Sequence, residues 1–411
     1  MKILPVIYLA YMFVSFYFLS LFLFLYIKNR KNLFDYPATN KKYEISIVVP
    51  CWNEEKTIGA TIEHLLEIKY EGLKKIIIVD DCSSDNSYNV IKKYAADNPK
   101  KIKVVRTPQN TGNAAGAKSY GAKFVDTELI GFVDADSYPA QDSISKLVGF
   151  FDDEKVGAAT CVVVPRNRNK FMEKMQVIEY NIIAFTRKLL GYVDAIYVTP
   201  GPLAIYKKSA FDEVNGFDVR NMTEDIEIVW HLIQKGYKIK MNLSATATTT
   251  APIKFKAWYR QRRRWNVGGL QCISKYKKES LKKGMLGMFV LPFFILQLFL
   301  GLLGLGIFLY LTITRLISNY LLMKYSIPVG VPLITMEDLY ITPSFLNYLG
   351  VILFILGMVF TFLVFSIMKD TVLKKQNIFN VLFYSVVYLT AYPFIMISAI
   401  YNYFKRDDKW R

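Results

Sequence analysis

Long uncharged apolar runs interrupt this 411-residue chain and constrain its fold more than any other feature. The first covers residues 4–27, and comparable runs occupy 287–314, 344–368 and 378–404. A helix that crosses a bilayer needs about 20 predominantly apolar residues. Each run is therefore long enough to span a membrane. The stretch between the first two runs, 29–285, has the mixed, charged composition of a globular domain.

The first apolar run admits two interpretations, a cleaved signal peptide and a permanent anchor. A signal peptide has an apolar core of about 7–15 residues and a small-residue cleavage site after it. The run at 4–27 exceeds that length, and no such site follows it. We therefore expect an uncleaved N-terminal transmembrane helix over 1–28.

Basic residues flank the apolar runs and predict their orientation. Lysines and arginines follow the first run at 28–31 and precede the second at 275–283. Because Lys and Arg accumulate in cytoplasmic loops, we expect a multi-pass protein of the cell membrane whose large domain is cytoplasmic. Lys369, Lys374 and Lys375 predict the same side for the 369–377 loop. Four spans would leave both termini outside the cell. The basic last residues fit an outside position badly, so the side of the C-terminus stays open.

The predicted organisation has four segments. They are an N-terminal transmembrane helix (1–28), a cytoplasmic α/β domain (29–250), interfacial helices (251–285) and a C-terminal transmembrane region of about three helices (286–411). The 287–314 run is long for one helix and short for two. A re-entrant piece there would reverse the side of the C-terminus.

Strands and helices alternate in the first part of the predicted domain. Apolar runs predict buried strands at 44–50, 74–81, 101–107 and 129–136. Between the first two, Ile58, Ile62 and Leu65 recur at helical spacing. Alternation of this kind predicts a mostly parallel sheet with helices on both faces.

Acidic residues stand at the ends of two predicted strands. Asp80 and Asp81 end the second, and Asp134 and Asp136 end the fourth. Asp is common in turns, but ligands of such sheets bind beyond the carboxyl ends of the strands. Two acidic turns at one edge therefore favour a binding site. Asp134 and Asp136 could hold a divalent cation such as Mg²⁺ together with the phosphate oxygens of a leaving diphosphate.

Several functional classes lack the motifs that they need. GxGxxG and the P-loop are absent, which argues against NAD binding and ATPase chemistry. Two histidines are too few for a His-based metal site, and four cysteines without CxxC spacing are expected to be reduced. The net charge of +18 would suit a non-enzymatic protein that binds anionic lipid or nucleic acid. It does not explain paired carboxylates at strand ends, so no nucleic-acid partner is expected.

Two further polar motifs precede the C-terminal membrane region. The TED triplet 223–225 is a good helix start with acids in the first turn, or it supplies a general base. In QRRRW at 261–265, the arginines form either a basic face at the anionic inner leaflet or a phosphate clamp. We assign Arg260, Arg262 and Arg263 mainly to the leaflet. From its position beside the predicted membrane region, Trp265 could simply be an interfacial aromatic.

An amphipathic helix is predicted at 171–189. One helical face carries apolar residues: Phe171, Met175, Ile178, Ile182, Phe185 and Leu189. Basic residues lie around it: Arg166, Arg168, Lys170, Lys174, Arg187 and Lys188. This could be an ordinary core helix, but we favour an interfacial helix on the inner leaflet. A second one is expected at 253–273, which carries QRRRW.

Six motifs together carry a resemblance to a known family. VVPCWNEEKTI, IVDDCSSDNS, FVDADS, GPLAIYKKSAFDEVNGF, TEDIEI and QRRRW appear in that order. This order is similar to that of the membrane-embedded inverting glycosyltransferases of family 2. Within them the chain resembles the synthases of hyaluronan, chitin, cellulose and poly-N-acetylglucosamine, and the chitooligosaccharide synthases of rhizobia. The resemblance covers 44–270 by motif and implies a GT-A (Rossmann-like) fold.

The resemblance implies a role for each matched acidic residue. Asp80 and Asp81 match the pair that binds the uracil and ribose of a UDP-sugar. Asp134 and Asp136 match the DxD motif that coordinates Mg²⁺ or Mn²⁺ and the diphosphate. In the TED motif, Asp225 matches the general base.

The resemblance also implies roles for residues outside these acid pairs. Arg264 would meet the diphosphate, and Trp265 would form a platform under the acceptor sugar. Gly201 and Pro202 belong to the segment that lines the sugar sites, and Glu224 is grouped with both the catalytic and the acceptor-binding residues. The remaining nucleotide-binding residues would be Pro50, Asn53, Glu55, Lys118 and Gln261.

The implied reaction is one displacement at the anomeric carbon, with inversion and with a nucleotide diphosphate as leaving group. A processive synthase would elongate a β-linked polysaccharide and pass it across the membrane. The alternative is a non-processive enzyme that moves one sugar to a polyprenyl phosphate or glycolipid in the inner leaflet. QRRRW favours the first, because the non-processive relatives usually lack it. Four spans make a thin channel, so a homo-oligomer is possible, and membrane lipids are expected partners.

Overall fold

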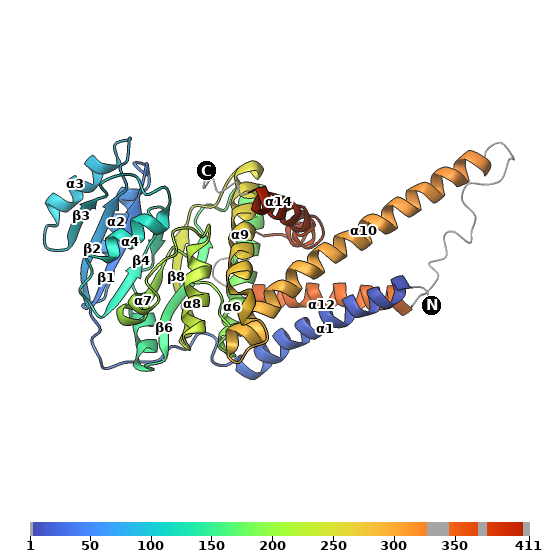
Figure 1. Cartoon of the computed structure of the whole chain (residues 1–411), viewed down its shortest axis with the longest axis horizontal. Coiled ribbons are helices and arrows are strands. Elements are labelled where there is room, and N and C mark those ends of the chain that lie inside the picture. Colours follow the sequence, from blue (N-terminus) through green and yellow to red (C-terminus); the bar gives the residue numbers. More distant parts are fainter. Residues whose placement is uncertain (1–2, 327–344, 369–375, 406–411) are drawn as a thin grey trace.

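The computed structural model describes residues 3–326, 345–368 and 376–405, and it shows an α/β domain beside a set of long helices (Figure 1). The basic loop at 369–375 and the last residues, 406–411, lie outside the described residues. The orientation signals that they carry therefore stay predictions.

One eight-stranded sheet forms the centre of the α/β domain, in the order β3-β2-β1-β4-β7-β6-β8-β5. Its strands are β1 (Ile45–Cys51), β2 (Leu73–Asp80), β3 (Ile102–Arg106), β4 (Leu129–Phe132), β5 (Ser137–Pro139), β6 (Val156–Pro165), β7 (Ala204–Lys207) and β8 (Lys238–Thr249). The first four strands pair in parallel, as do β6 and β8, whereas β7 and β5 pair antiparallel. The mostly parallel sheet expected from the sequence is confirmed.

Helices cover the sheet and continue into the membrane part. In the α/β domain they are α2 (Ile58–Leu66), α3 (Ser87–Asp97), α4 (Ala114–Ala122), α5 (Ser145–Val148), α6 (Phe171–Gly191), α7 (Lys208–Glu213), α8 (Glu224–Gln234) and α9 (Phe255–Tyr276), with a 3₁₀ turn at Gly149–Asp152. The long apolar helices are α1 (Ile3–Asn29), α10 (Leu291–Ser326), α12 (Phe345–Ile367), α13 (Ile378–Phe383) and α14 (Ala391–Lys405). A 3₁₀ turn at Lys277–Glu279 and π-helical turns at Leu286–Val290 and Tyr384–Tyr388 connect them.

The strand pattern explains the two layers of the core. In β1, Ile47 and Val49 join one buried cluster, whereas Val48 between them joins the other. Successive side chains of a strand point to opposite faces, so a continuous apolar run places residues in both layers. Ile62 of α2 packs in the first cluster and Ala117 of α4 in the second, so helices lie on both faces.

Four helical segments in the described part of the chain are long and apolar enough to cross a membrane. They are Leu4–Asn29, Leu286–Tyr325, Tyr348–Ile367 and Ile378–Lys405. The run at 287–314 lies in one continuous helical segment, formed by the π-helical turn Leu286–Val290 and α10, rather than in two helices. Figure 1 shows α10 extending far from the α/β domain, with α1 and α12 side by side.

Helix α6 lies between the sheet and the membrane helices. It packs against β6 and β8 and also against α1 and α12. Four of the six residues of its apolar face, Met175, Ile178, Phe185 and Leu189, are buried inside the protein, whereas Ile182 is half-buried and Phe171 is exposed. The core-helix alternative therefore describes α6 better than a helix whose apolar face lies free for lipid. The helix expected at 253–273 is α9, which packs against α8, α10 and α14.

Candidate active site

A cavity of about 670 Å³ opens where the carboxyl ends of β1 and β4 meet α4, α6, α8 and α9. This volume lies in the range of small-molecule sites, about 300–1,000 Å³. Most of the residues that the sequence assigned to the site line it: Pro50, Asp81, Lys118, Asp134, Asp136, Gly201, Pro202, Glu224, Asp225, Gln261, Arg264 and Trp265. The structure thus brings motifs spread over more than 200 residues into one space.

Three predicted nucleotide-binding residues do not line this cavity. Asp80 is fully buried, and its Oδ2 lies 3.1 Å from Nε of Arg106, its neighbour in β3. The side chains of Asn53 and Glu55 accept hydrogen bonds from backbone N–H groups in the turn after β2. These contacts hold the turns after β1 and β2 together, so in this structure the three side chains support the site from outside.

Asp81 lines the cavity, yet its carboxylate is already engaged with the loop after β3. Its Oδ1 accepts hydrogen bonds from Thr107 Oγ1 (2.8 Å) and from the Thr111 amide (3.0 Å). Its Oδ2 accepts from Thr111 Oγ1 (2.8 Å). Asp81 therefore orients the loop that leads into α4.

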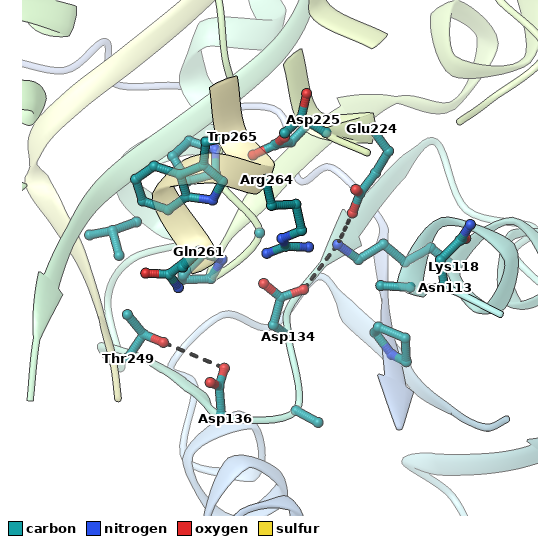
Figure 2. Close-up of a pocket in the computed structure, with 18 of the residues that line it drawn as sticks. Asn113, Lys118, Asp134, Asp136, Glu224, Asp225, Thr249, Gln261, Arg264 and Trp265 are labelled. Carbon is teal, nitrogen blue, oxygen red and sulfur yellow. Dashed lines mark hydrogen bonds and ion pairs between the residues drawn. The ribbon is translucent and has the colours of Figure 1, made fainter. Parts of the chain in front are cut away.

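Lys118 joins two of the acidic motifs (Figure 2). It stands on α4, which begins after Asn113 because the Asn113 side chain accepts a hydrogen bond from the Gly116 amide (2.9 Å). Its Nζ lies 2.9 Å from Asp134 Oδ1 and 2.9 Å from Glu224 Oε1. Burial alone lowers the pKa of Lys118, but these two carboxylates raise it above its ordinary value. The lysine therefore stays charged.

Glu224 and Asp225 begin α8, but they face different environments. Although burial opposes it, Lys118 holds the pKa of Glu224 below its ordinary value, so Glu224 stays ionised. Burial, followed by the charge of Glu224, raises the pKa of Asp225 to about 7. A carboxylate that titrates near neutral pH suits a general base. Thr223 occupies the N-cap position without a side-chain cap bond, so the helix-start interpretation of TED is confirmed in position only.

The carboxylates at the end of β4 are crowded. Burial, then the charges of Asp134 and Glu54, raise the pKa of Asp136 to about 6. Asp136 Oδ1 accepts hydrogen bonds from Ser137 Oγ (3.1 Å) and Thr249 Oγ1 (3.4 Å). A cation would relieve this repulsion, so the donor set fits a hard divalent ion. Among the described residues no group of three acidic, His or Cys side chains is placed to hold a metal by itself, so ligand oxygens would have to complete the shell.

Two glycines allow close approach around these acids. A Cβ added to Gly201 would lie 2.0 Å from Asp134 Oδ2, so only glycine lets the segment after α6 pass this carboxylate. A Cβ on Gly268 of α9 would lie 2.0 Å from Thr223 Oγ1. The start of α8 is therefore pressed directly against α9, which brings the TED and QRRRW motifs together.

Helix α9 presents Gln261, Arg264 and Trp265 to the cavity. The spacings of three and four place these residues on one helical face. In Figure 2 the Arg264 guanidinium is turned toward Asp134. The assignment of Arg264 to the cavity rather than to a lipid-facing surface agrees with this placement.

The prediction that Arg262 faces the inner leaflet is wrong. Arg262 is 0% exposed and meets Glu179 of α6 through Nε–Oε1 (2.8 Å) and Nη2–Oε2 (2.5 Å). Its guanidinium carbon also lies 4.1 Å from the ring centre of Trp265. Glu179 further accepts hydrogen bonds from Tyr388 (2.7 Å) and Tyr392. Arg262 therefore supports the cavity wall from behind and connects it to the last membrane segment.

Arg187 and Lys188 were expected among the basic residues around the amphipathic helix, but both are buried. Lys188 donates a hydrogen bond to the backbone oxygen of Met241 (3.0 Å). Arg187 instead lines the cavity. No sequence signal indicates this, since neither residue belongs to a motif and helical spacing alone does not reveal what covers each face.

Comparisons with known proteins agree with this architecture. Residues 46–214 match the model described as glycosyl transferase family 2. The chain is 30% identical over 266 residues to a poly-beta-1,6-N-acetyl-D-glucosamine synthase of Staphylococcus aureus (strain COL), covering 62% of this chain and 64% of that relative. With the Staphylococcus epidermidis enzyme of the same name it shares 30% identity over 288 residues, 69% of this chain and 68% of the relative.

A solved structure shows the same fold over nearly the whole chain. The mannosyltransferase PcManGT from Pyrobaculum calidifontis, solved in complex with GDP-Man and Mn2+, matches with a TM-score of 0.63. The match covers 98% of this chain and 99% of that one at 17% identity, so it concerns the fold alone. The GT-A-like architecture and the relationship suggested by the motifs are thereby confirmed, and the chain belongs to glycosyl transferase family 2.

Proposed function

We propose that this protein transfers a sugar from a UDP-sugar to an acceptor hydroxyl with inversion, and that the product is a β-linked polysaccharide. The observation that carries the proposal is the meeting of Asp225, Arg264 and the Asp134–Asp136 pair in one cavity. A base, a cation for a leaving diphosphate and crowded carboxylates are the groups that such a displacement needs.

The chemistry follows from where these groups stand. Asp225 would take the proton of the acceptor hydroxyl while the acceptor oxygen bonds to the anomeric carbon. The bond from that carbon to the diphosphate oxygen breaks, and its electron pair leaves with UDP. Because nucleophile and leaving group lie on opposite sides of the carbon, the configuration inverts. Glu224, held by Lys118, would keep the start of α8 in place rather than move a proton.

The leaving group would be bound at the end of β4. Asp134 and Asp136 are the residues that would hold Mg²⁺ or Mn²⁺, and the cation would neutralise charge on the departing diphosphate. Arg264 offers a planar fork that matches phosphate oxygens. Trp265 provides an indole face for the acceptor sugar, and Arg262 fixes that face from behind.

The membrane helices support a role at the lipid surface. We place the α/β domain on the cytoplasmic side of the cell membrane, where nucleotide sugars are made, and expect the product to cross through the helical part. The relatives named above are poly-beta-1,6-N-acetyl-D-glucosamine synthases. UDP-N-acetylglucosamine is therefore the first donor to test. A homo-oligomer would widen the path that few helices provide.

A second candidate is the transfer of one sugar to a polyprenyl phosphate or glycolipid. The observation that favours it is Arg187, a buried cation in the same cavity that has no acidic partner in the described part of the chain. A lipid phosphate would supply such a partner.

One experiment separates the candidates. The protein is reconstituted in lipid nanodiscs and given a panel of labelled UDP-sugars with Mn²⁺, and the products are sized and partitioned between water and organic solvent. Long water-soluble polymer supports the first candidate, and an organic-soluble single-sugar product supports the second. Absence of donor turnover with every nucleotide sugar would overturn both.

A further inference from the structure

Arg187 is a buried cation on the wall of the cavity, and the chemistry proposed for polysaccharide synthesis gives it no role. It stands on α6, near the end of the helix, and only 6% of its surface is exposed. Arginine stays charged in proteins, and a buried charge without a counter-ion is costly. A folded protein keeps such a group at this cost where something binds to it.

The other buried cations of this region all have partners. Lys118 is paired with Asp134 and Glu224, and Arg262 with Glu179. By contrast, Nε of Arg187 has no hydrogen-bond partner among the residues that the structure describes. No ion pair joins its guanidinium to any carboxylate of residues 3–326, 345–368 or 376–405. The guanidinium of Arg187 thus has N–H donors available to a ligand, and it lines a cavity large enough for one.

The surroundings of Arg187 place it on the side of the base. Burial lowers the pKa of the Arg187 guanidinium, and Tyr197 and then Asp225 act against this lowering. Arg187 and Asp225 line the same cavity, and the charge of Asp225 acts on the Arg187 guanidinium. In an inverting displacement the base stands opposite the leaving group, so a group near Asp225 meets the acceptor rather than the diphosphate.

The wall around Arg187 is apolar and aromatic. Ile183 and Tyr180, one and two turns before it on α6, line the cavity together with Tyr197 and Val198. The opposite side of α6 contacts the membrane helices α1 and α12. This part of the cavity therefore combines one cation with a water-poor lining, which strengthens any charge-assisted bond made there.

We propose that Arg187 binds an anionic group of the acceptor, a phosphate or a carboxylate, and holds it beside Asp225. The planar guanidinium matches either anion in a two-point contact. A phosphate would come from a lipid-linked acceptor and a carboxylate from a uronic acid in a growing chain. The inference rests on the proposed glycosyl transfer and adds the charge of the acceptor, which that proposal leaves open.

The test uses the full-length protein in nanodiscs and a matched set of variants. Arg187→Gln removes the charge, and Arg187→Lys keeps the charge without the planar fork. Lys188→Gln removes the same charge at the next position of α6, outside the cavity lining, and serves as the control. Each variant is assayed with polyprenyl phosphate, with an oligosaccharide that ends in a uronic acid, and with a neutral N-acetylglucosamine oligosaccharide. Donor hydrolysis without acceptor is measured alongside.

We expect Arg187→Gln to lower kcat/KM for an anionic acceptor by about 10- to 100-fold, the loss typical of a hydrogen bond to a charged group. Donor hydrolysis and use of the neutral acceptor should stay within about twofold, as should every activity of Lys188→Gln. Arg187→Lys should recover part of the loss. The anionic acceptor that the wild type uses distinguishes the lipid phosphate from the uronic acid.

Three results would overturn the inference. They are a wild type that uses only neutral acceptors, an Arg187→Gln variant as active as the wild type on the anionic acceptor, and an equal loss on all acceptors. The last would mean that Arg187 serves packing or the titration of Asp225. A wild type that turns over no nucleotide sugar at all would instead remove the proposed function itself.

Discussion

Glu179 and Arg262 form a two-point ion pair that joins α6 to α9 in the interior of the protein, with distances of 2.8 and 2.5 Å. Tyr388, in the π-helical turn before α14, donates a third bond to the same carboxylate. One acidic side chain thereby links the helix behind the cavity, the helix that carries Trp265 and the last membrane segment.

Breaking this pair on one side is expected to be strongly destabilising. Arg262→Met leaves Glu179 buried without its cation, which costs about 3–5 kcal/mol. Thermal unfolding of the detergent-solubilised protein measures the loss. The double variant Arg262→Met/Glu179→Leu should be less destabilised than Arg262→Met alone, because no charge is left unpaired. If the double variant is the less stable of the two, the pair itself, not the unpaired charge, sets the stability.

Asp225→Asn is expected to abolish sugar transfer while UDP binding changes by less than about threefold. An amide cannot accept the acceptor proton, and loss of a general base lowers rates by about 10²–10⁴-fold. Rates come from labelled-donor transfer and binding from calorimetry. Asp212→Asn is the control, since this exposed residue lies outside the cavity lining and pairs with Lys208, one helical turn away. An equal loss of binding and transfer in Asp225→Asn would remove the base role.

The pH dependence of kcat/KM should rise with pH and reach half of its maximum near pH 7. Burial and Glu224 raise the pKa of Asp225 to about 7, so below that pH the carboxyl is protonated and cannot accept a proton. The rate should therefore fall about tenfold per unit below pH 6 and level off above pH 8. Initial rates at low donor concentration between pH 5.5 and 9 give the profile. A flat profile would contradict this assignment.

Removal of the divalent cation should weaken UDP binding, and Asp136→Asn should make binding insensitive to the cation. Asp136 is the carboxylate whose pKa is raised to about 6 by burial and by its acidic neighbours, which is the repulsion that a cation relieves. Titrations of UDP with Mn²⁺ and with EDTA test this. Wild-type binding of equal strength in both conditions would mean that Asp134 and Asp136 hold no metal.

Trp265→Ala should shorten the product or weaken acceptor use more than it reduces donor hydrolysis. The indole lines the cavity and is fixed from behind by Arg262, so its loss removes an acceptor surface and leaves the diphosphate side intact. Gel sizing of labelled product is the measurement. Trp265→Phe keeps an aromatic face, so its product length should fall between those of the wild type and Trp265→Ala. Unchanged product length in Trp265→Ala would count against a platform.

Sequence motifs placed the acidic centre of the site well, and the reason is geometric. Asp81, Asp134 and Asp136 follow parallel strands, whose carboxyl ends share one edge, so their meeting could be expected before any coordinates. The direction in which each side chain of a motif points could not be expected in this way. Asp80 precedes Asp81 by one residue and consequently faces Arg106 in the adjacent strand instead of the cavity.

The sequence did not predict the burial of the cations Arg187 and Arg262, and the reason is a different one. Helical spacing shows which residues share a face, but not what that face packs against. Arg187 and Arg262 looked like parts of basic surfaces until α6 was seen between the sheet and the membrane helices. Their surroundings come from segments far along the chain, such as Glu179 for Arg262 and Asp225 for Arg187.

Lys118 gives the cavity a property that neither of its carboxylate partners has alone. One ammonium group is shared between Asp134, at the proposed donor side, and Glu224, next to Asp225. A ligand that draws Asp134 away leaves the ammonium with Glu224 alone and so alters the field at the neighbouring carboxyl. Binding of the nucleotide sugar is thus expected to change the proton affinity that the acceptor meets at Asp225, and by reciprocity a bound acceptor should change the affinity for the nucleotide sugar.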